Sequence, residues 1–168
     1  MKDLYVYDFD KTLISYDTFR RFLWHLCNYR PIAVISLILL RKMRILSSCS
    51  LKEKITKMVE RSTFLKRKTE AYAKMIEQDI EWPRNNGTIV VVTASPMVYM
   101  KYIVDNKSYQ MLCSDYIGED YIEMYGKMKA KYLFRMYPSS DYRYIYASSD
   151  SKSDLCWMKE FQEYNLIE

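Results

Sequence analysis

Two aspartates, Asp8 and Asp10, are the residues of this sequence best suited to chemistry. They follow the apolar stretch 4–7, which predicts a β-strand that ends where the acidic pair begins. Residues i and i+2 of a strand share a face, so we expect both carboxylates to approach one site. One carboxylate of such a pair can coordinate a divalent cation and act as a nucleophile, while the other acts as a general acid and then as a base. The simpler alternative is a pair of aspartates that ends a strand and solvates a turn.

A second polar group follows the β-branched run 88–92, which is preceded by the Asn-Gly turn signal at 85–87. This pattern predicts a buried parallel strand. Thr93 and Ser95 then lie at its carboxyl end, where a following helix offers backbone N–H groups to an anion.

A third strand is predicted over 142–147, and it ends in a small, polar loop that contains Asp150 and Asp154. We expect Asp154 to cap the helix that follows while Asp150 faces the site. Lys127 and Lys129, which lie between the second and third strands, are candidate sources of positive charge.

The order of these motifs resembles the four-motif signature of the haloacid dehalogenase-like superfamily, over nearly the whole chain. The long interval between Thr12 and Thr88 is typical of the phosphoserine-phosphatase-like branch, in which a helical cap is inserted directly after the first motif. The resemblance implies a three-layer α/β core of Rossmann-like topology with a parallel sheet. We expect residues 1–13 and 86–168 to form this catalytic core and residues 14–85 to form the inserted helical cap.

The resemblance also implies a role for each matching residue. Asp8 is expected to be the nucleophile that forms an aspartyl-phosphate, and Asp10 the general acid and base. A magnesium ion, Mg2+, would be held by Asp8, the backbone carbonyl of Asp10 and Asp150. Thr93 and the backbone N–H of Ala94 would bind the phosphoryl oxygens. An acid at the position of Asp10 favours phosphate-ester hydrolysis over dehalogenation, because a phosphatase must protonate its leaving alcohol.

The family's phosphate-binding lysine has two candidates. Lys127 follows Gly126, as in phosphoserine phosphatases, whereas Lys129 suits the wider hydrolase subgroup. Residues two apart on a helix point about 200° from each other, so only one of them can face the phosphate. We predict Lys127, and we expect Asp154 to lie behind the metal ligands.

The substrate is less defined than the reaction. Asp17 aligns with the acidic residue of the phosphoserine phosphatase substrate pocket, so it either contacts the substrate or caps the first cap helix. Ser95 is the other residue expected between site and cap. Ser149 and Ser151 flank Asp150 where phosphoserine phosphatase has glycines, which argues against phosphoserine itself. We therefore predict a Mg2+-dependent phosphatase for a small phosphorylated substrate, with phosphotransfer to another acceptor and a catalytically silent relative as alternatives.

The apolar segment 31–40 of the cap is bounded by Arg30 and by the basic residues 41–42. A segment this short cannot span a bilayer as a helix, so we predict a buried cap helix. The alternative is a cap that touches a membrane, with Arg41, Lys42 and Arg44 meeting anionic head groups. The substrate would then be a lipid phosphomonoester, as for a phosphatidylglycerophosphatase-like enzyme.

Composition excludes several other functions. A net charge of +5 suits an anionic substrate, but it is too small and too dispersed to indicate nucleic-acid binding. The four cysteines have no paired spacing and there is one histidine, so neither a zinc site nor a disulfide framework is expected. These features, and a first strand that begins without a signal peptide, predict a cytoplasmic protein, peripheral to the membrane only if the cap touches it. The strand that family members add after the last helix is expected to be missing or reduced to 165–167. No feature indicates an oligomeric state.

Overall fold

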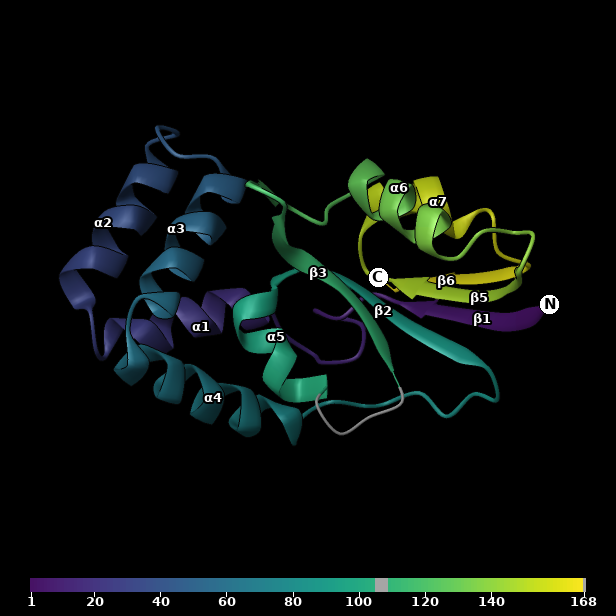
Figure 1. The fold of residues 1–168 in the computed structure, drawn as a ribbon, viewed down its shortest axis with the longest axis horizontal. Helices are drawn as coiled ribbons and strands as arrows, with labels where there is room; N and C mark the ends of the chain where they lie inside the picture. The colour runs from purple at the N-terminus through teal and green to yellow at the C-terminus, as the bar shows by residue number, and fades with distance from the viewer. Residues whose placement is uncertain (105–108, 168) are drawn as a thin grey trace.

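The computed structural model describes residues 1–104 and 109–167, and it contains a six-stranded sheet with helices on both faces (Figure 1). The strands are β1 (Lys2–Tyr7), β2 (Thr88–Pro96), β3 (Gln110–Ile117), β4 (Asp120–Ile122), β5 (Tyr142–Ser149) and β6 (Glu163–Leu166). The helices are α1 (Thr18–Cys27), α2 (Pro31–Lys42), α3 (Ser48–Glu60), α4 (Thr63–Glu77), α5 (Met97–Val104), α6 (Lys127–Met136) and α7 (Leu155–Met158).

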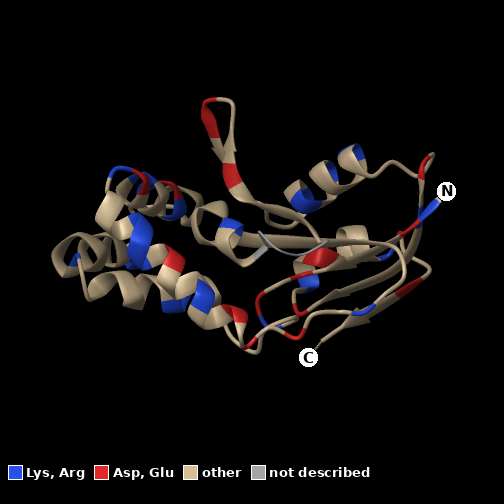
Figure 2. Cartoon of the chain, turned by 60° about the horizontal axis from the view of Figure 1, so that its bottom comes forward, with Lys and Arg blue, Asp and Glu red and all other residues tan. Residues whose placement is uncertain are grey.

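The strand order is β4-β3-β2-β1-β5-β6, with β1 in the middle. β1 pairs in parallel with both β2 and β5, and the outer strands β3 and β6 continue the parallel arrangement. Only β4 is antiparallel; it forms a hairpin with β3 that projects from the sheet and carries acidic residues at its tip (Figure 2). The predicted α/β core of Rossmann-like topology is confirmed.

Alternation along the central strands separates two hydrophobic layers. Leu4 and Val6 of β1 pack in one cluster, while Tyr7 belongs to the other. Val90 of β2 belongs to the same cluster as Leu4 and Val6, and Val91 belongs to the same cluster as Tyr7. Because side chains of a strand point alternately to opposite faces, both faces of this sheet are apolar and both need a cover.

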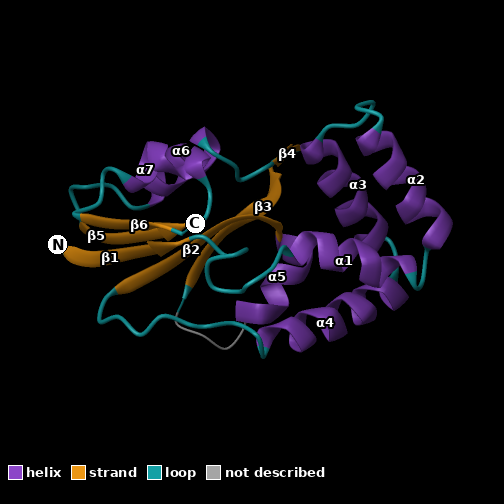
Figure 3. Ribbon diagram, turned by 180° about the vertical axis from the view of Figure 1, so that it is seen from behind, coloured by secondary structure: helices purple, strands orange, loops and turns teal. Residues whose placement is uncertain are grey.

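Helices α6 and α7 cover one face, and α5, with α4 packed against it, covers the other (Figures 1 and 3). Leu133 of α6 and Trp157 of α7 are fully buried in the first cluster. Val98 and Met100 of α5 are buried in the second. The chain therefore forms the three layers expected for the core.

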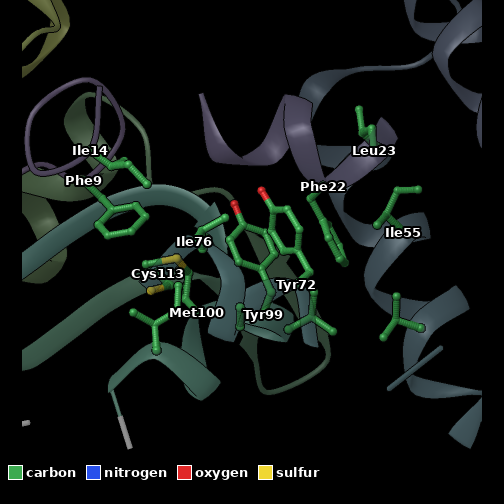
Figure 4. Close-up of a cluster of buried hydrophobic side chains, with 14 of the residues drawn as sticks. Phe9, Ile14, Phe22, Leu23, Ile55, Tyr72, Ile76, Tyr99, Met100 and Cys113 are labelled. Carbon is green, nitrogen blue, oxygen red and sulfur yellow. The ribbon is translucent and has the colours of Figure 1, made fainter. Parts of the chain in front are cut away.

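Four helices, α1 to α4, lie between β1 and β2 in the sequence and gather at one end of the sheet (Figure 3). We call these helices the cap. Phe22 of α1, Tyr72 of α4 and Tyr99 of α5 are in mutual ring contact, with centroids 4.8 to 5.7 Å apart (Figure 4). The same cluster includes Phe9, which follows β1. One continuous hydrophobic cluster thus joins the cap to the sheet.

We predicted a buried helix over 31–40; the helix is confirmed, but the prediction that it is buried was wrong. The segment does form a helix, α2, but Val34 is its only buried residue. Ile32 is 83% exposed and Leu39 is 52% exposed. The reason is that α2 lies at the outer edge of the cap, where only one of its sides meets other helices (Figure 1). Within residues 1–104 and 109–167, no helix combines the length and apolar character needed to cross a membrane.

Two smaller differences concern strand ends. β2 runs on to Pro96 beyond the predicted end of the strand, and its pairing with β3 shifts register after Val92. The last strand is longer than the predicted remnant, because β6 begins at Glu163 and pairs in parallel with β5.

Candidate active site

Asp8 follows β1 directly, and its backbone continues the pairing with β5, because its N–H donates to the carbonyl of Ser148 at 2.8 Å. Its side chain is 6% exposed. One carboxylate oxygen accepts a hydrogen bond of 2.7 Å from Nζ of Lys129. The same nitrogen donates to Asp154 at 2.6 Å, and Asp154 also accepts from the Ser149 hydroxyl at 2.8 Å. A single buried cation therefore joins two buried carboxylates.

Burial and neighbouring charges shift the pKa values of Asp8 and Lys129 in opposite directions. Burial raises the pKa of Asp8 to about 7, although the charge of Lys129 lowers it. Burial lowers the pKa of Lys129, but the charges of Asp8 and Asp154 outweigh this and leave it raised. Lys129 is therefore protonated at neutral pH, and it favours the ionised form of the carboxylates that it contacts.

We predicted that Lys127, rather than Lys129, faces the phosphate, but the structure places Lys129 against the carboxylates. Lys127 is the first residue of α6 and is exposed, whereas Lys129 is 3% exposed and points into the site. The helix begins immediately after Gly126, whose φ of 51° lets the chain turn sharply there. This starting point fixes the rotation of α6, and with it the lysine that meets Asp8.

Asp10 is oriented by three hydrogen bonds. The backbone N–H and the hydroxyl of Thr18 donate to one carboxylate oxygen, both at 2.6 Å, and the Ser95 hydroxyl donates to the other at 2.6 Å. Burial raises the pKa of Asp10, although these hydrogen bonds lower it. Lys11, with φ of 57°, turns the chain just beyond Asp10, a conformation that glycine adopts most easily. A half-buried carboxyl group with a raised pKa suits a general acid.

The C-terminal part of β2 contributes Thr93 and Ala94. Thr93 is fully buried, and its hydroxyl accepts from the backbone N–H of Ser95 at 3.0 Å. The carbonyl of Ala94 accepts from Nζ of Lys52 at 2.8 Å and from the Ser114 hydroxyl at 2.7 Å. Lys52 belongs to α3, so the cap contacts the end of β2 directly.

Asp150 follows β5 and is partly exposed, with one carboxylate oxygen 4.0 Å from Nζ of Lys11. The predicted capping role of Asp154 was wrong. Its side chain makes no capping hydrogen bond to α7 and is fully buried instead. The physical reason is Lys129, which offers a charged donor that a helix terminus cannot match.

Most of the predicted site residues line one cavity of about 460 Å³. Its lining includes Asp8, Asp10, Thr93, Ala94, Lys129 and Asp150. A second cavity of about 270 Å³ is lined by Asp10, Ser95 and Asp150 of the core and by Asp17 and Lys52 of the cap. Lys127 and Asp154 line neither cavity. Asp17 also caps α1, since its carboxylate accepts from the backbone N–H of Arg20 at 2.8 Å.

Sequence reasoning missed several polar residues of the site. Lys52 lies within an ordinary amphipathic helix, and no local pattern distinguishes it from the exposed Lys54. Tyr125 and Lys152 line the larger cavity from loops beside α6 and β5. Thr18 offered a weak signal, because it stands next to Asp17 at the start of a predicted helix.

The donor set suits a hard divalent cation. Among the residues that the structure describes, no three acidic, histidine or cysteine side chains gather as a ready-made metal cluster. The expected set needs only two carboxylates, Asp8 and Asp150, with a backbone carbonyl of Asp10, and all three residues line the larger cavity. One carboxylate oxygen of Asp154 is buried without a hydrogen-bond partner, so the carboxylate that shares Lys129 with Asp8 keeps an unused acceptor. The residues therefore fit a magnesium ion.

The family model for haloacid dehalogenase-like hydrolases matches residues 5–159. The chain therefore belongs to the haloacid dehalogenase-like hydrolase family, as its motifs predicted. A search of curated proteins finds no match.

Three solved structures share the fold. A protein of unknown function from Bordetella pertussis Tohama I has a TM-score of 0.62 at 16% identity, over 92% of this chain and 85% of that one. Phosphoserine phosphatase in its apo form has a TM-score of 0.56 at 13% identity, over 98% and 85% of the two chains. A family hydrolase from Salmonella enterica subsp. enterica serovar Typhi has a TM-score of 0.55 at 9% identity, over 95% and 60%. At identities of 9 to 16%, these likenesses show a shared fold.

Proposed function

We propose that this hydrolase cleaves phosphate monoesters through an aspartyl-phosphate on Asp8. The observation that carries the proposal is the buried contact of Asp8 with Lys129, beside the separately oriented Asp10 in the same cavity. A phosphoryl group is an anion and is repelled by two carboxylates unless cations accompany them. Lys129 supplies one such cation at hydrogen-bond distance from the nucleophile.

Asp8 and Asp10 divide the chemistry between them. In the first step a carboxylate oxygen of Asp8 bonds to phosphorus while the bond from phosphorus to the alcohol oxygen breaks. Asp10 gives its proton to that oxygen, and the alcohol leaves. In the second step Asp10 takes a proton from a water molecule, whose oxygen bonds to phosphorus and releases Asp8 and inorganic phosphate. A raised pKa suits Asp10 to hold a proton for the leaving alcohol and then to take one from water.

The other residues of the cavity bind and orient. Thr93 and Ala94 line the cavity, and the hydroxyl of Thr93 and the backbone N–H of Ala94 would bind the phosphoryl oxygens through fixed dipoles that need no reorganisation during the reaction. Asp8, Asp150 and the carbonyl of Asp10 would hold Mg2+, which neutralises phosphoryl charge when bound. Lys129 keeps Asp8 in place through the pair of bonds that it shares with Asp154.

The smaller cavity is where the rest of the substrate is expected. Its volume of about 270 Å³ suits a small organic group, and Lys52 and Asp17 give it both signs of charge. Nζ of Lys52 donates to the carbonyl of Ala94 and, at 2.6 Å, to the carboxylate of Glu123. Lys52 therefore connects helix α3 of the cap to the strand that is expected to bind the phosphoryl group. We propose a small phosphorylated metabolite as the substrate class. Phosphoserine is the substrate that the name of one structural neighbour indicates, and it belongs in the first screen.

The test is release of inorganic phosphate from an aryl phosphate with Mg2+ and with a chelator. Asp8→Asn is expected to abolish release and phosphoenzyme formation and to keep the fold, because it removes the nucleophile and preserves the shape of the side chain. Lys127→Met is the control, since that lysine is exposed and is expected to retain wild-type turnover. Turnover that survives in Asp8→Asn would refute the assignment of the nucleophile.

A further inference from the structure

Helix α2 carries an apolar stripe that no other part of the described structure covers. Ile32, Ile35 and Leu39 follow one another at helical spacing and are 83%, 45% and 52% exposed. Met43 continues the stripe just beyond the helix and is 66% exposed. Ile45, in the following turn, is 65% exposed. Contiguous exposed apolar side chains of this size mark an interaction surface more often than an ordinary protein surface.

The fold does not need this stripe. α2 also has an inner side, where Val34 is fully buried and Leu37 and Ile38 pack against the shared cluster of the cap and the sheet. These inner residues are enough to hold α2 on its neighbours. The outer stripe is therefore additional apolar surface, and α2 itself lies at the end of the cap that is farthest from the sheet (Figures 1 and 3).

Basic residues surround the stripe. Arg30 precedes α2, while Arg41, Lys42 and Arg44 stand at its other end, and all four are exposed. The sequence contains no Asp or Glu between Asp17 and Glu53, although the chain has 21 acidic residues in all. This long stretch without acidic residues gives α2 and the turn that follows it a single sign of charge.

A basic groove continues this surface. A cavity of about 580 Å³ lies between the start of α2 and the helices α3 and α4, and Arg30, Lys54, Lys57 and Arg61 contribute its cations. Of these, Lys57 is paired with Glu53 at 2.7 Å. The groove has the volume and the charge to take an anionic head group beside the apolar stripe.

We propose that the α2 surface, formed by the stripe and its flanking basic residues, docks on an anionic lipid bilayer. The helix would lie in the plane of the interface, with Ile32, Ile35 and Leu39 among the upper acyl chains and the basic residues among the head groups. Charge complementarity selects this occupant. In a symmetric dimer through α2, the same basic residues of two copies would face each other, and like charges repel.

This inference stands apart from the proposed phosphatase activity, because it rests on the outer side of the cap and not on the cavity at Asp8. The test is co-sedimentation of the full chain with phosphatidylcholine vesicles, with and without 30% phosphatidylglycerol. We expect binding to the mixed vesicles that weakens at high salt, since the flanking charges are screened. Binding to pure phosphatidylcholine is expected to be at least about tenfold weaker.

Two variants separate the apolar from the basic contribution. Ile32→Gln with Leu39→Gln is expected to weaken binding to the mixed vesicles by at least about tenfold, through lost apolar burial. Replacing Arg41, Lys42 and Arg44 by Gln is expected to weaken it about a hundredfold, because each basic residue near a charged surface contributes to binding. Met75→Gln with Met136→Gln is the matched control, since both methionines are 54% exposed and lie outside the α2 surface. All variants should keep the wild-type circular dichroism spectrum.

Three results would overturn the proposal. The first is no binding of the wild-type chain to the mixed vesicles. The second is an equal loss in the methionine control, which would mean that any exposed apolar residue suffices. The third is a dimer in sedimentation velocity that dissociates in the Ile32→Gln and Leu39→Gln variant without vesicle binding, which would make a second copy the occupant.

Discussion

Replacing Lys129 by Met tests the electrostatic logic of the site without requiring a substrate. The side chain is 3% exposed and its nitrogen contacts Asp8 at 2.7 Å and Asp154 at 2.6 Å. Methionine is similar in length and leaves both carboxylates buried with no cation between them. Breaking a buried ion pair by removing one partner destabilises a protein by about 3–5 kcal/mol. For a chain of this size, about 1 kcal/mol corresponds to about 2–4 °C, so we expect the melting temperature to fall by about 10 °C.

The loss is expected to depend on pH. Burial already raises the pKa of Asp8 to about 7, and without Lys129 it rises further. When a carboxyl group has a higher pKa in the folded state than in the unfolded state, the free energy of unfolding decreases as the pH rises from the unfolded-state pKa through the folded-state pKa. The variant should therefore be much less stable than the wild-type chain at pH 8. The difference should shrink toward pH 5, where Asp8 takes up a proton.

The assay is urea denaturation followed by circular dichroism at both pH values, with chelator present so that no metal compensates for the missing cation. Lys127→Met on the same helix is the control, because its side chain is exposed and the substitution should change stability by no more than about 0.5 kcal/mol. Adding Asp154→Asn to Lys129→Met should recover part of the loss, since one of the two buried charges is removed. Equal stability of the Lys127 and Lys129 variants, or a loss that does not vary with pH, would refute the reasoning.

Two further predictions concern Asp10 and the cap. Asp10→Asn is expected to lower turnover of an aryl phosphate by at least about a hundredfold, because the leaving alcohol loses its proton donor; steady-state kinetics of a variant with unchanged melting temperature would check this. Lys52→Met should destabilise the fold by about 1–3 kcal/mol in urea titration, because it removes the cation from the partly buried carboxylate of Glu123 and one of the two donors to the carbonyl of Ala94. Lys54→Met, on the exposed side of the same helix, serves as its control, and equal effects of the two substitutions would count against the role given to Lys52.

The parts of the site that could be predicted from sequence are those that end a strand. Asp8, Thr93 and Asp150 each follow an apolar or β-branched run, and parallel strands bring their carboxyl ends to one edge of the sheet. This geometry follows from topology alone, so local patterns were sufficient to place these three residues together.

The lysine could not be chosen in the same way, because its direction depends on the rotation of a helix. The sequence shows that Lys127 and Lys129 point apart, but the first residue of α6 decides which of them faces inward. That boundary depends on the turn at Gly126, where a positive φ begins the helix abruptly. Lys52 is harder still to predict, since its contact with Ala94 depends on how the cap packs on the core.

The exposure of α2 escaped prediction for a related reason. An apolar segment indicates that a helix can be buried, but whether it is buried depends on how many neighbours the fold provides. Val34 is fully buried on one side of the helix, whereas Ile32 is 83% exposed. A continuously apolar segment therefore predicts secondary structure better than it predicts burial.

The middle position of β1 in the sheet has a consequence for how the chain folds. Leu4 pairs with Thr88, and Lys2 pairs with Tyr142. Both partner strands of β1 therefore lie far from it in the sequence. Contacts of such long range form slowly, because the ends of a long loop must meet before any pairing compensates for the lost entropy. On the ribosome β1 emerges before both of its neighbours, while the helices of the cap can form early from local contacts. The order of synthesis therefore favours a helical cap that forms first and a catalytic edge that is completed only when β5 arrives.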